Sequence, residues 1–213
     1  MECRGKEKRR RIVKDYYVKP IAHLSLLAGQ KKHSDAGAII EVEYYIFEAI
    51  HKENGKKEVI QCGMGAARDF LALLKHEGLP LFNPLHGEKY SHEISRLSKD
   101  NLEQVREVWN PTAKQLYNAI MWLIIAWDAK PGTPLFKIKD EIEQHKNDEP
   151  HYSRIKSINT IIKNGGKGQT LTDIINDLRQ DNNIREDFCK FDLLKEKIIC
   201  STDKNKNTIK SFF

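Results

Sequence analysis

The chain has 213 residues, of which 39% are apolar and 31% are charged, and its formal net charge at pH 7 is +6. This composition excludes an intrinsically disordered chain, and a chain of this length can bury a hydrophobic core. The longest apolar run, residues 121–127, is too short to cross a bilayer, so we expect no membrane-spanning segment. No apolar segment follows the basic N-terminal residues, so we expect no secretory signal peptide. Four widely spaced cysteines then predict reduced thiols in a cytoplasmic protein, and we expect no metal and no other cofactor.

Basic residues concentrate near the N-terminus, where residues 4–19 contain eight basic and two acidic side chains. We predict that residues 1–19 form a mobile basic arm with an anionic partner, and nucleic acid is the commonest such partner in the cytosol. Phosphate and stacking contacts are expected from Arg9, Arg10, Arg11, Lys14, Tyr16 and Tyr17. The alternative interpretation is a solubilising tail that binds nothing specific.

The next segments predict a β-hairpin. The apolar residues 21–28 predict a short helix that ends at Gly29, and the alternating residues 38–50 predict a strand. Asn54-Gly55 favours a two-residue turn, and residues 57–62 predict the return strand. Such a turn pairs Ile50 with Val59 and Phe47 with Cys62.

A glycine-containing turn, residues 63–65, leads from this hairpin into a predicted helix over residues 66–75. The turn resembles the glycine-rich first motif of class I methyltransferases, but Val59 stands where that motif has an acidic residue and Gln61 where it has its first glycine. Arg68 occupies the third glycine position of a dinucleotide fingerprint. We therefore interpret these glycines as turn residues.

The remainder of the chain has helical patterns. A first helix is predicted over residues 100–109, and Asn110-Pro111 predicts the start of a second, broadly apolar helix that ends near Trp127. Four shorter helices are expected over residues 135–146, 152–163, 171–179 and 184–199. Thr170 and Asp173 have the spacing of a capping box.

These elements predict an α+β fold, in which an N-terminal antiparallel β-hairpin or small sheet packs on a larger, mostly α-helical body. We expect a basic arm over residues 1–19, a single α+β domain over residues 20–200 and a polar C-terminal tail over residues 201–213. The proline- and glycine-rich segment near residue 131 marks a possible subdivision of the domain.

Two alternatives to nucleic-acid binding follow from other segments. In the first, the protein is a small hydrolase or nuclease-like enzyme, with His86, His92 and Glu93 acting together with Cys62 or with strand glutamates. In the second, the chain end docks on a protein partner. Residues 206–213 resemble the peptide that binds the sliding clamp, with Ile209 as the aliphatic plug and Phe212 and Phe213 as the aromatic pair, although Lys206 stands where that peptide has Gln. Of the three readings, the sequence favours a non-catalytic, nucleic-acid-associated accessory protein.

Overall fold

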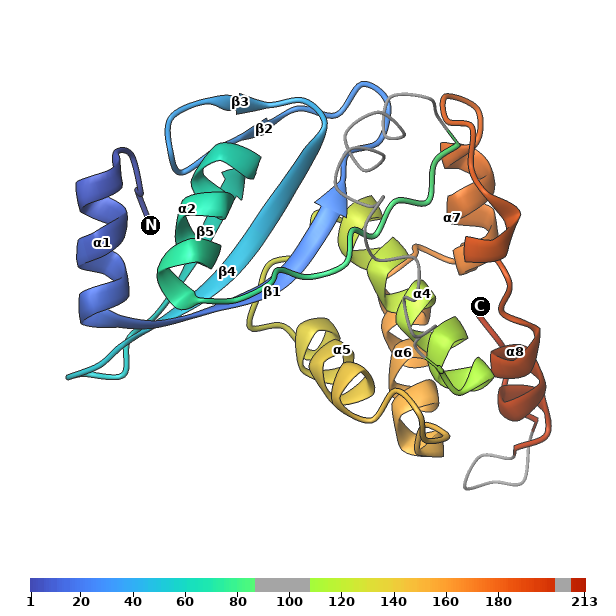
Figure 1. Cartoon of the computed structure of the whole chain (residues 1–213). Coiled ribbons are helices and arrows are strands. Elements are labelled where there is room, and N and C mark those ends of the chain that lie inside the picture. The colour runs from blue at the N-terminus through green and yellow to red at the C-terminus, as the bar shows by residue number, and fades with distance from the viewer. Residues whose placement is uncertain (87–107, 202–207) are drawn as a thin grey trace. The chain divides into compact units, whose positions relative to one another are not determined.

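A computed structural model describes residues 1–86, 108–201 and 208–213, and the chain divides into two compact units, Met1–Asn83 and Pro84–Phe213 (Figure 1). Every strand of the described chain that pairs into a sheet lies in the first unit, and the second unit is mainly helical. The predicted α+β class, with an N-terminal antiparallel sheet followed by a mostly helical body, is therefore confirmed.

The first unit is built on a three-stranded antiparallel sheet. Its strands are β1 (Tyr16–Ser25), β4 (Glu43–His51) and β5 (Lys57–Gly63), and β4 lies between the other two. Two short strands, β2 (Lys32–His33) and β3 (Ile39–Ile40), form a second, antiparallel pair. β4 and β5 are the hairpin that the sequence predicts.

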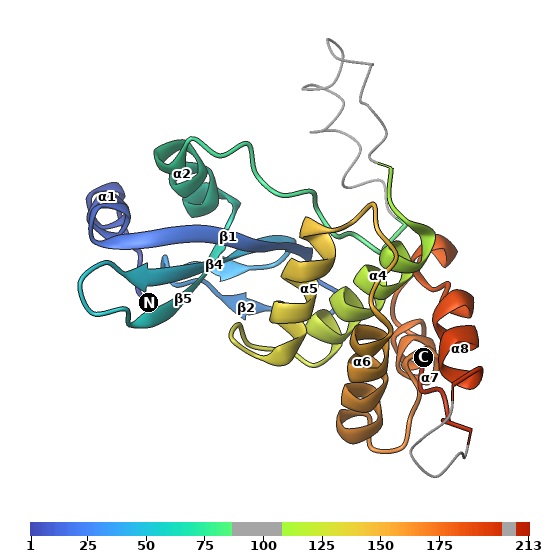
Figure 2. The same ribbon diagram turned by 90° about the horizontal axis from the view of Figure 1, so that it is seen from below.

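Helices α1 (Lys6–Asp15) and α2 (Met64–Leu74) lie side by side on one face of this sheet (Figure 2). Successive side chains of a strand point to opposite faces, so alternate residues of β4 meet the two helices. The resulting core contains Tyr45, Phe47, Ala49, Ile60, Cys62, Phe70 and Ile12, all of them buried. On the opposite face, Tyr44 and Ile46 are buried too, and the amine of Lys32 lies 5.0 Å from the centre of the Tyr44 ring.

The register of the hairpin differs from the predicted one by two residues. Phe47 pairs with Ile60 instead of Cys62, and Ile50 pairs with Lys57 instead of Val59. A two-residue type I′ turn requires positive φ at both central residues, and of Asn54 and Gly55 only Gly55 has it. The strands are instead joined by a four-residue loop that is closed by hydrogen bonds from the His51 amide to the Lys56 carbonyl and from the Gly55 amide to the His51 carbonyl. A shift of two residues keeps each side chain on its predicted face.

Two other N-terminal predictions differ from the structure. Residues 21–28, predicted as a helix, form the second half of β1 and the loop after it, because Ala22 to Ser25 pair with β4. β1 is an edge strand with a register irregularity after Pro20, and an edge strand tolerates proline in this way. Residues 6–15, which were predicted as part of a mobile arm, form α1 and bury Ile12 and Arg9.

The second unit is organised around α4 (Pro111–Ala126), whose residues from Thr112 to Ile125 are almost all buried. The predicted start of this helix is confirmed, since the Asn110 side chain accepts hydrogen bonds from the amides of Thr112 and Ala113 at 2.9 and 3.2 Å. Around it lie α5 (Pro134–Gln144), α6 (Tyr152–Gly165), α7 (Leu171–Leu178) and α8 (Asp192–Ile199). The capping box of Thr170 and Asp173 is also confirmed at the start of α7.

The helix predicted over residues 184–199 is shorter than expected. Ile184 forms a bridge with Leu85, and the Arg185 amide donates to the Pro84 carbonyl, so this part of the chain is extended. A short 3-10 turn, Glu186–Phe188, follows, and α8 begins at Asp192. The helix predicted over residues 100–109 falls mostly outside the described residues.

Candidate nucleic-acid interface

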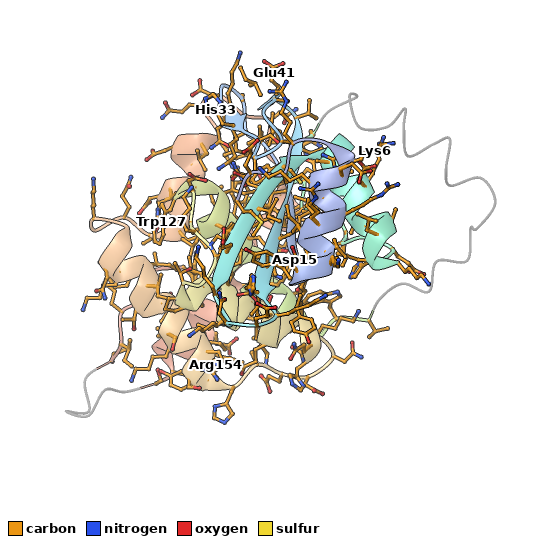
Figure 3. The ribbon with its side chains drawn as sticks, turned by 90° about the vertical axis from the view of Figure 1, so that its left-hand side faces the viewer. Lys6, Asp15, His33, Glu41, Trp127 and Arg154 are labelled. Atoms are coloured by element: carbon orange, nitrogen blue, oxygen red, sulfur yellow. The ribbon has the colours of Figure 1, made fainter. Side chains whose placement is uncertain are left out.

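The helix α1 carries most of the basic residues that the sequence analysis singled out. Six of its ten residues are basic and two are acidic. Its inward side is narrow, because only Arg9, Ile12 and the half-buried Val13 turn toward the core. A helix advances 100° per residue, so the remaining positions cover a broad outward arc. Figure 3 looks onto this helix, with Lys6 and Asp15 at its two ends.

Arg9 is a structural residue in this arrangement. Its guanidinium donates to Asp69 of α2 through Nη2 at 2.5 Å and through Nε at 3.1 Å, and to the Cys3 carbonyl through Nη1 at 2.9 Å. The residue is only 8% exposed. Because these contacts join α1, α2 and the N-terminal segment, Arg9 is not part of the surface that α1 offers to a partner.

The outward side chains of α1 form what we call the α1 basic face, which consists of Lys6, Lys8, Arg10, Arg11 and Lys14. Lys6, Arg10 and Lys14 are four residues apart and therefore form one row along the helix. Lys8 pairs with Glu2 at 2.8 Å, and Arg10 pairs with Glu7 at 2.6 Å. These pairs are exposed, and exposed pairs hold their partners weakly.

A hollow of about 770 Å³ borders the part of this face that carries Lys6, Lys8 and Arg11. Its lining combines basic, acidic and aromatic residues, among them Arg4, Lys8, Arg11, Glu7, Asp15 and Tyr16. A second hollow, of about 250 Å³, lies between α1 and α2 and is lined by Lys6, Arg10, Asp69, Ala72 and Leu73. The basic face is thus hollowed on two sides, which suits an extended ligand better than a flat surface would.

The two tyrosines that follow α1 point to opposite faces of the sheet. The Tyr16 hydroxyl donates to Glu58 at 3.3 Å, its ring meets His51 edge-on, and burial next to the Glu58 carboxylate raises its pKa. Tyr17 is 66% exposed and has the amine of Lys52 5.4 Å from its ring centre. Of the two rings, Tyr17 is therefore the one open to a ligand.

Lys52 joins the hairpin loop to the end of α1. Its amine donates to the carbonyls of Val13 and Lys14 at 3.2 and 2.6 Å, and its amide donates to the Asp15 carbonyl at 3.0 Å. These are carbonyls of the last turn, which have no partner within a helix, and a lysine suits this negative end of the helix dipole. Lys52 is not among the contact residues predicted from the sequence, and no local pattern indicates it, because its contacts with Lys14 and Val13 span 38 and 39 residues.

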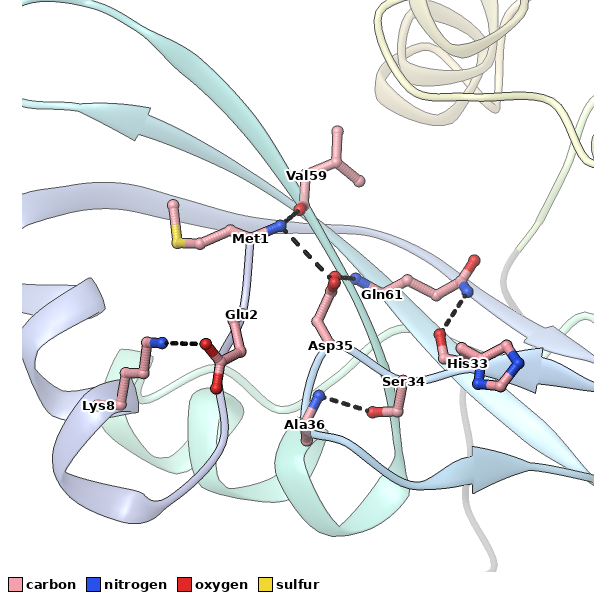
Figure 4. A network of polar contacts seen from close by, with 9 residues as sticks. All are labelled: Met1, Glu2, Lys8, His33, Ser34, Asp35, Ala36, Val59 and Gln61. Atoms are coloured by element: carbon pink, nitrogen blue, oxygen red, sulfur yellow. Dashed lines mark hydrogen bonds and ion pairs between the residues drawn. The ribbon is translucent and has the colours of Figure 1, made fainter.

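A polar network holds the N-terminal segment against the edge of the sheet (Figure 4). The amino group of Met1 donates to the Val59 carbonyl at 2.8 Å and lies 3.7 Å from the Asp35 carboxylate. Asp35 also accepts a hydrogen bond from the Gln61 amide at 2.7 Å, and its carbonyl accepts one from the Cys3 amide at 2.8 Å. Residues 1–3 are therefore tied to β5, which orients α1 from its N-terminal side.

The predicted catalytic residues do not form a describable site. His92 and Glu93 lie outside the described residues, and His86 lies in the second unit, where its amide donates to the Asn183 carbonyl. Cys62 is fully buried in the core of the first unit. A hydrogen bond with Cys3 and burial raise the pKa of the Cys62 thiol, which disfavours the reactive thiolate. Among the described residues, no group of three or more His, Cys, Asp and Glu side chains has the arrangement of a metal site.

The C-terminal residues pack on the second unit. Phe212 and Phe213 are buried, and Ile209 is half-buried. The Asn159 side chain of α6 brackets the tail, because its Nδ2 donates to the Lys210 carbonyl at 3.0 Å and its Oδ1 accepts from the Phe212 amide at 2.7 Å. Docking of this tail on a partner therefore stays a prediction, and it requires that the aromatic pair leave its present site.

The fold and the interface define a class of protein: an α+β protein with a small antiparallel sheet, a basic helix packed on it and a helical second unit. A family model described as "Uncharacterised conserved protein UCP028583" matches residues 1–202, and the chain belongs to this family. No curated protein and no solved structure gives a significant match to the chain. In the part of the chain that the structure describes, no helix is long and apolar enough to cross a membrane.

Proposed function

We propose that the protein is a non-catalytic, nucleic-acid-associated accessory protein that binds the phosphate backbone through the α1 basic face. The observation that carries this proposal is the exposed α1 basic face, together with the hollow of about 770 Å³ that its members Lys6, Lys8 and Arg11 line. Lysine and arginine side chains attract phosphates and release condensed counterions, which favours binding without sequence specificity.

The fixed conformation of α1 supports the proposal further. Arg9 and Ile12 set which side of the helix faces the core, and Lys52 holds its last turn. A helix anchored at both ends presents its basic side chains without ordering a flexible segment first, so less entropy is lost on binding. A cytoplasmic location belongs to the same proposal, because the four cysteines are free thiols.

The test is a titration of fluorescein-labelled DNA and RNA with the full chain, followed by anisotropy at several salt concentrations. We expect a micromolar or tighter dissociation constant that rises steeply between about 50 and about 200 mM salt. The variant Arg11→Gln/Lys14→Gln removes two exposed charges and should weaken binding to every sequence. Its plot of log affinity against log salt should lose about two units of slope, one for each phosphate contact.

A charge-matched control is available in the second unit. Lys156 and Lys163 are exposed on α6, so Lys156→Gln/Lys163→Gln lowers the net charge by the same amount and leaves α1 unchanged. We expect this control to bind as the wild type does. Equal losses from both variants would mean that net charge alone causes binding, and the absence of any salt-sensitive binding by the wild type would refute the proposed function.

A further inference from the structure

The face of the three-stranded sheet opposite to α1 and α2 carries an exposed aromatic and basic surface at the end where β1 follows α1. Tyr17 of β1 pairs with Ile50 of β4, and Ile50 pairs with Lys57 of β5. Directly paired residues point to the same face, so these three side chains form a row across the sheet. The row lies on the face opposite to α1 and α2, since Tyr16 and Ala49 belong to the core under those helices.

This end of the face is accessible, although Tyr44 and Ile46 farther along the same face are buried. Tyr17 is 66% exposed, the Lys57 side chain is 68% exposed, and Ile50 is half-buried between them. An exposed aromatic side chain beside a lysine is the arrangement on which single-stranded nucleic acids stack their bases. The Glu48 carboxylate on the same face lies 3.5 Å from the Lys57 amine and neutralises part of its charge.

Lys52 connects this surface to the α1 basic face. Its amine donates to the Lys14 carbonyl at 2.6 Å and lies 5.4 Å from the centre of the Tyr17 ring. The positive charge of Lys52 therefore lies both at the end of α1 and near the Tyr17 ring. Lys52 is the basic side chain that lies between the last turn of α1 and the Tyr17 ring.

We propose that the ligand of this surface is single-stranded nucleic acid, with one unpaired base stacked on Tyr17 and the adjoining phosphates on Lys14 and Lys52. The inference rests on the proposed function and names its substrate class. A duplex keeps its bases paired and stacked on one another, so it contacts the lysines and leaves the Tyr17 ring without a base. Since every base has an aromatic face, the preference is for an unpaired strand and not for a sequence.

The experiment compares the full-length wild type with Tyr17→Leu and Tyr17→Phe. Leucine keeps an apolar side chain beside Ile50 but has no aromatic face, whereas phenylalanine keeps the ring. The probes are oligothymidylate and oligouridylate of about 20 nucleotides and a DNA duplex of the same length. We expect Tyr17→Leu to weaken single-strand binding about ten-fold and duplex binding less than about two-fold, and Tyr17→Phe to bind as the wild type does.

The outcomes separate the two proposals. If the wild type binds none of the probes, the proposed function fails and this inference fails with it. A second outcome overturns only the stacking inference. In it, the wild type binds and Arg11→Gln/Lys14→Gln weakens binding, but Tyr17→Leu either binds single strands as tightly as the wild type does or loses affinity equally for single strands and duplex. Thermal unfolding of each variant, followed by circular dichroism, confirms that any loss of binding is measured on folded protein.

Discussion

The three consecutive arginines of α1 have three different environments. Arg9 is buried against Asp69, Arg10 pairs with Glu7 on the surface, and Arg11 is exposed. Neighbouring residues on a helix are 100° apart, so a basic run in the sequence is not a single basic patch in space. The phase of the helix, set by Ile12 and Arg9, decides which of these charges reaches a ligand.

Replacement of Arg9 should therefore affect stability, and replacement of Arg11 should affect binding. Arg9→Ala leaves the Asp69 carboxylate without its partner in a half-buried position, and we expect the free energy of unfolding to fall by about 3 kcal/mol. Arg11→Ala should change it by less than about 0.5 kcal/mol, as is usual at an exposed position. Urea denaturation measures both values.

One outcome would contradict this assignment of Arg9 to the core. If Arg9→Ala is as stable as the wild type and binds nucleic acid more weakly, Arg9 contacts the ligand and the helix phase described above is wrong.

At the scale of elements, the length of the hairpin loop is linked to its contacts with the end of α1. A two-residue loop at Asn54-Gly55 is the one that local sequence favours. In the four-residue loop, Lys52 instead reaches the carbonyls of Val13, Lys14 and Asp15. Those contacts explain why the loop is longer than the predicted turn and why the register moves by two residues.

Glycine positions in the helices offer a test of packing. A Cβ added at Gly165, the last residue of α6, would lie 2.8 Å from Cη2 and 2.9 Å from Cζ3 of the Trp127 ring. We expect Gly165→Ala to lower the free energy of unfolding by about 2 kcal/mol, because such overpacking forces the ring to move.

Gly65 of α2 is the matched control, since its added Cβ meets no atom within 4 Å apart from its chain neighbours and the adjacent backbone of its own helix, and its φ is not positive. Gly65→Ala should raise the free energy of unfolding by about 0.5 kcal/mol, because alanine loses less backbone entropy on folding. Thermal denaturation compares the two variants, and equal effects would show that Trp127 does not pack on Gly165 as described.

The two hydrogen bonds of the Asn159 side chain allow a test of how the C-terminal residues are held on the second unit. Asn159 is 4% exposed and makes two hydrogen bonds to the main chain of the tail, to Lys210 and Phe212. Asn159→Ala removes both and leaves buried polar groups without partners, so we expect a loss of about 3 kcal/mol in the free energy of unfolding. Hydrogen exchange at the Phe212 amide should become faster.

Asn164 serves as the control for this variant, because it lies on the same helix and is exposed. Asn164→Ala should stay within about 0.5 kcal/mol of the wild type. Should Asn159→Ala leave the exchange at the Phe212 amide unchanged, the tail would be held by its two aromatic side chains and not by the hydrogen bonds of Asn159.

At the scale of the whole molecule, the proposed interface lies entirely in the first unit, Met1–Asn83. The last residues of this unit are joined to its sheet, because the Phe82 amide donates to the His23 carbonyl and the Phe82 carbonyl accepts from the Ser25 amide. We expect a fragment of residues 1–86 to unfold cooperatively in urea and to bind nucleic acid with the salt dependence of the full chain. A folded fragment with no affinity would show that the second unit contributes to binding.

The sequence by itself determined the features that depend on neighbouring residues. The alternation of β4, the Asn110 cap and the Thr170–Asp173 capping box were predicted correctly, because each arises from contacts within a few residues. The basic character of the N-terminus was also evident, but not which of its side chains are exposed.

Only the tertiary structure decided the register of the hairpin, the burial of Arg9 and the position of Lys52 between α1 and Tyr17. The contacts responsible join residues 35 to 60 positions apart, Arg9 with Asp69 and Lys52 with Tyr17 and the end of α1 among them. Such contacts form only when the core of α1, α2 and the sheet has packed, and no local propensity encodes them. For that reason the charge of the candidate interface could be predicted from the sequence, whereas its shape and its exposed aromatic ring could not.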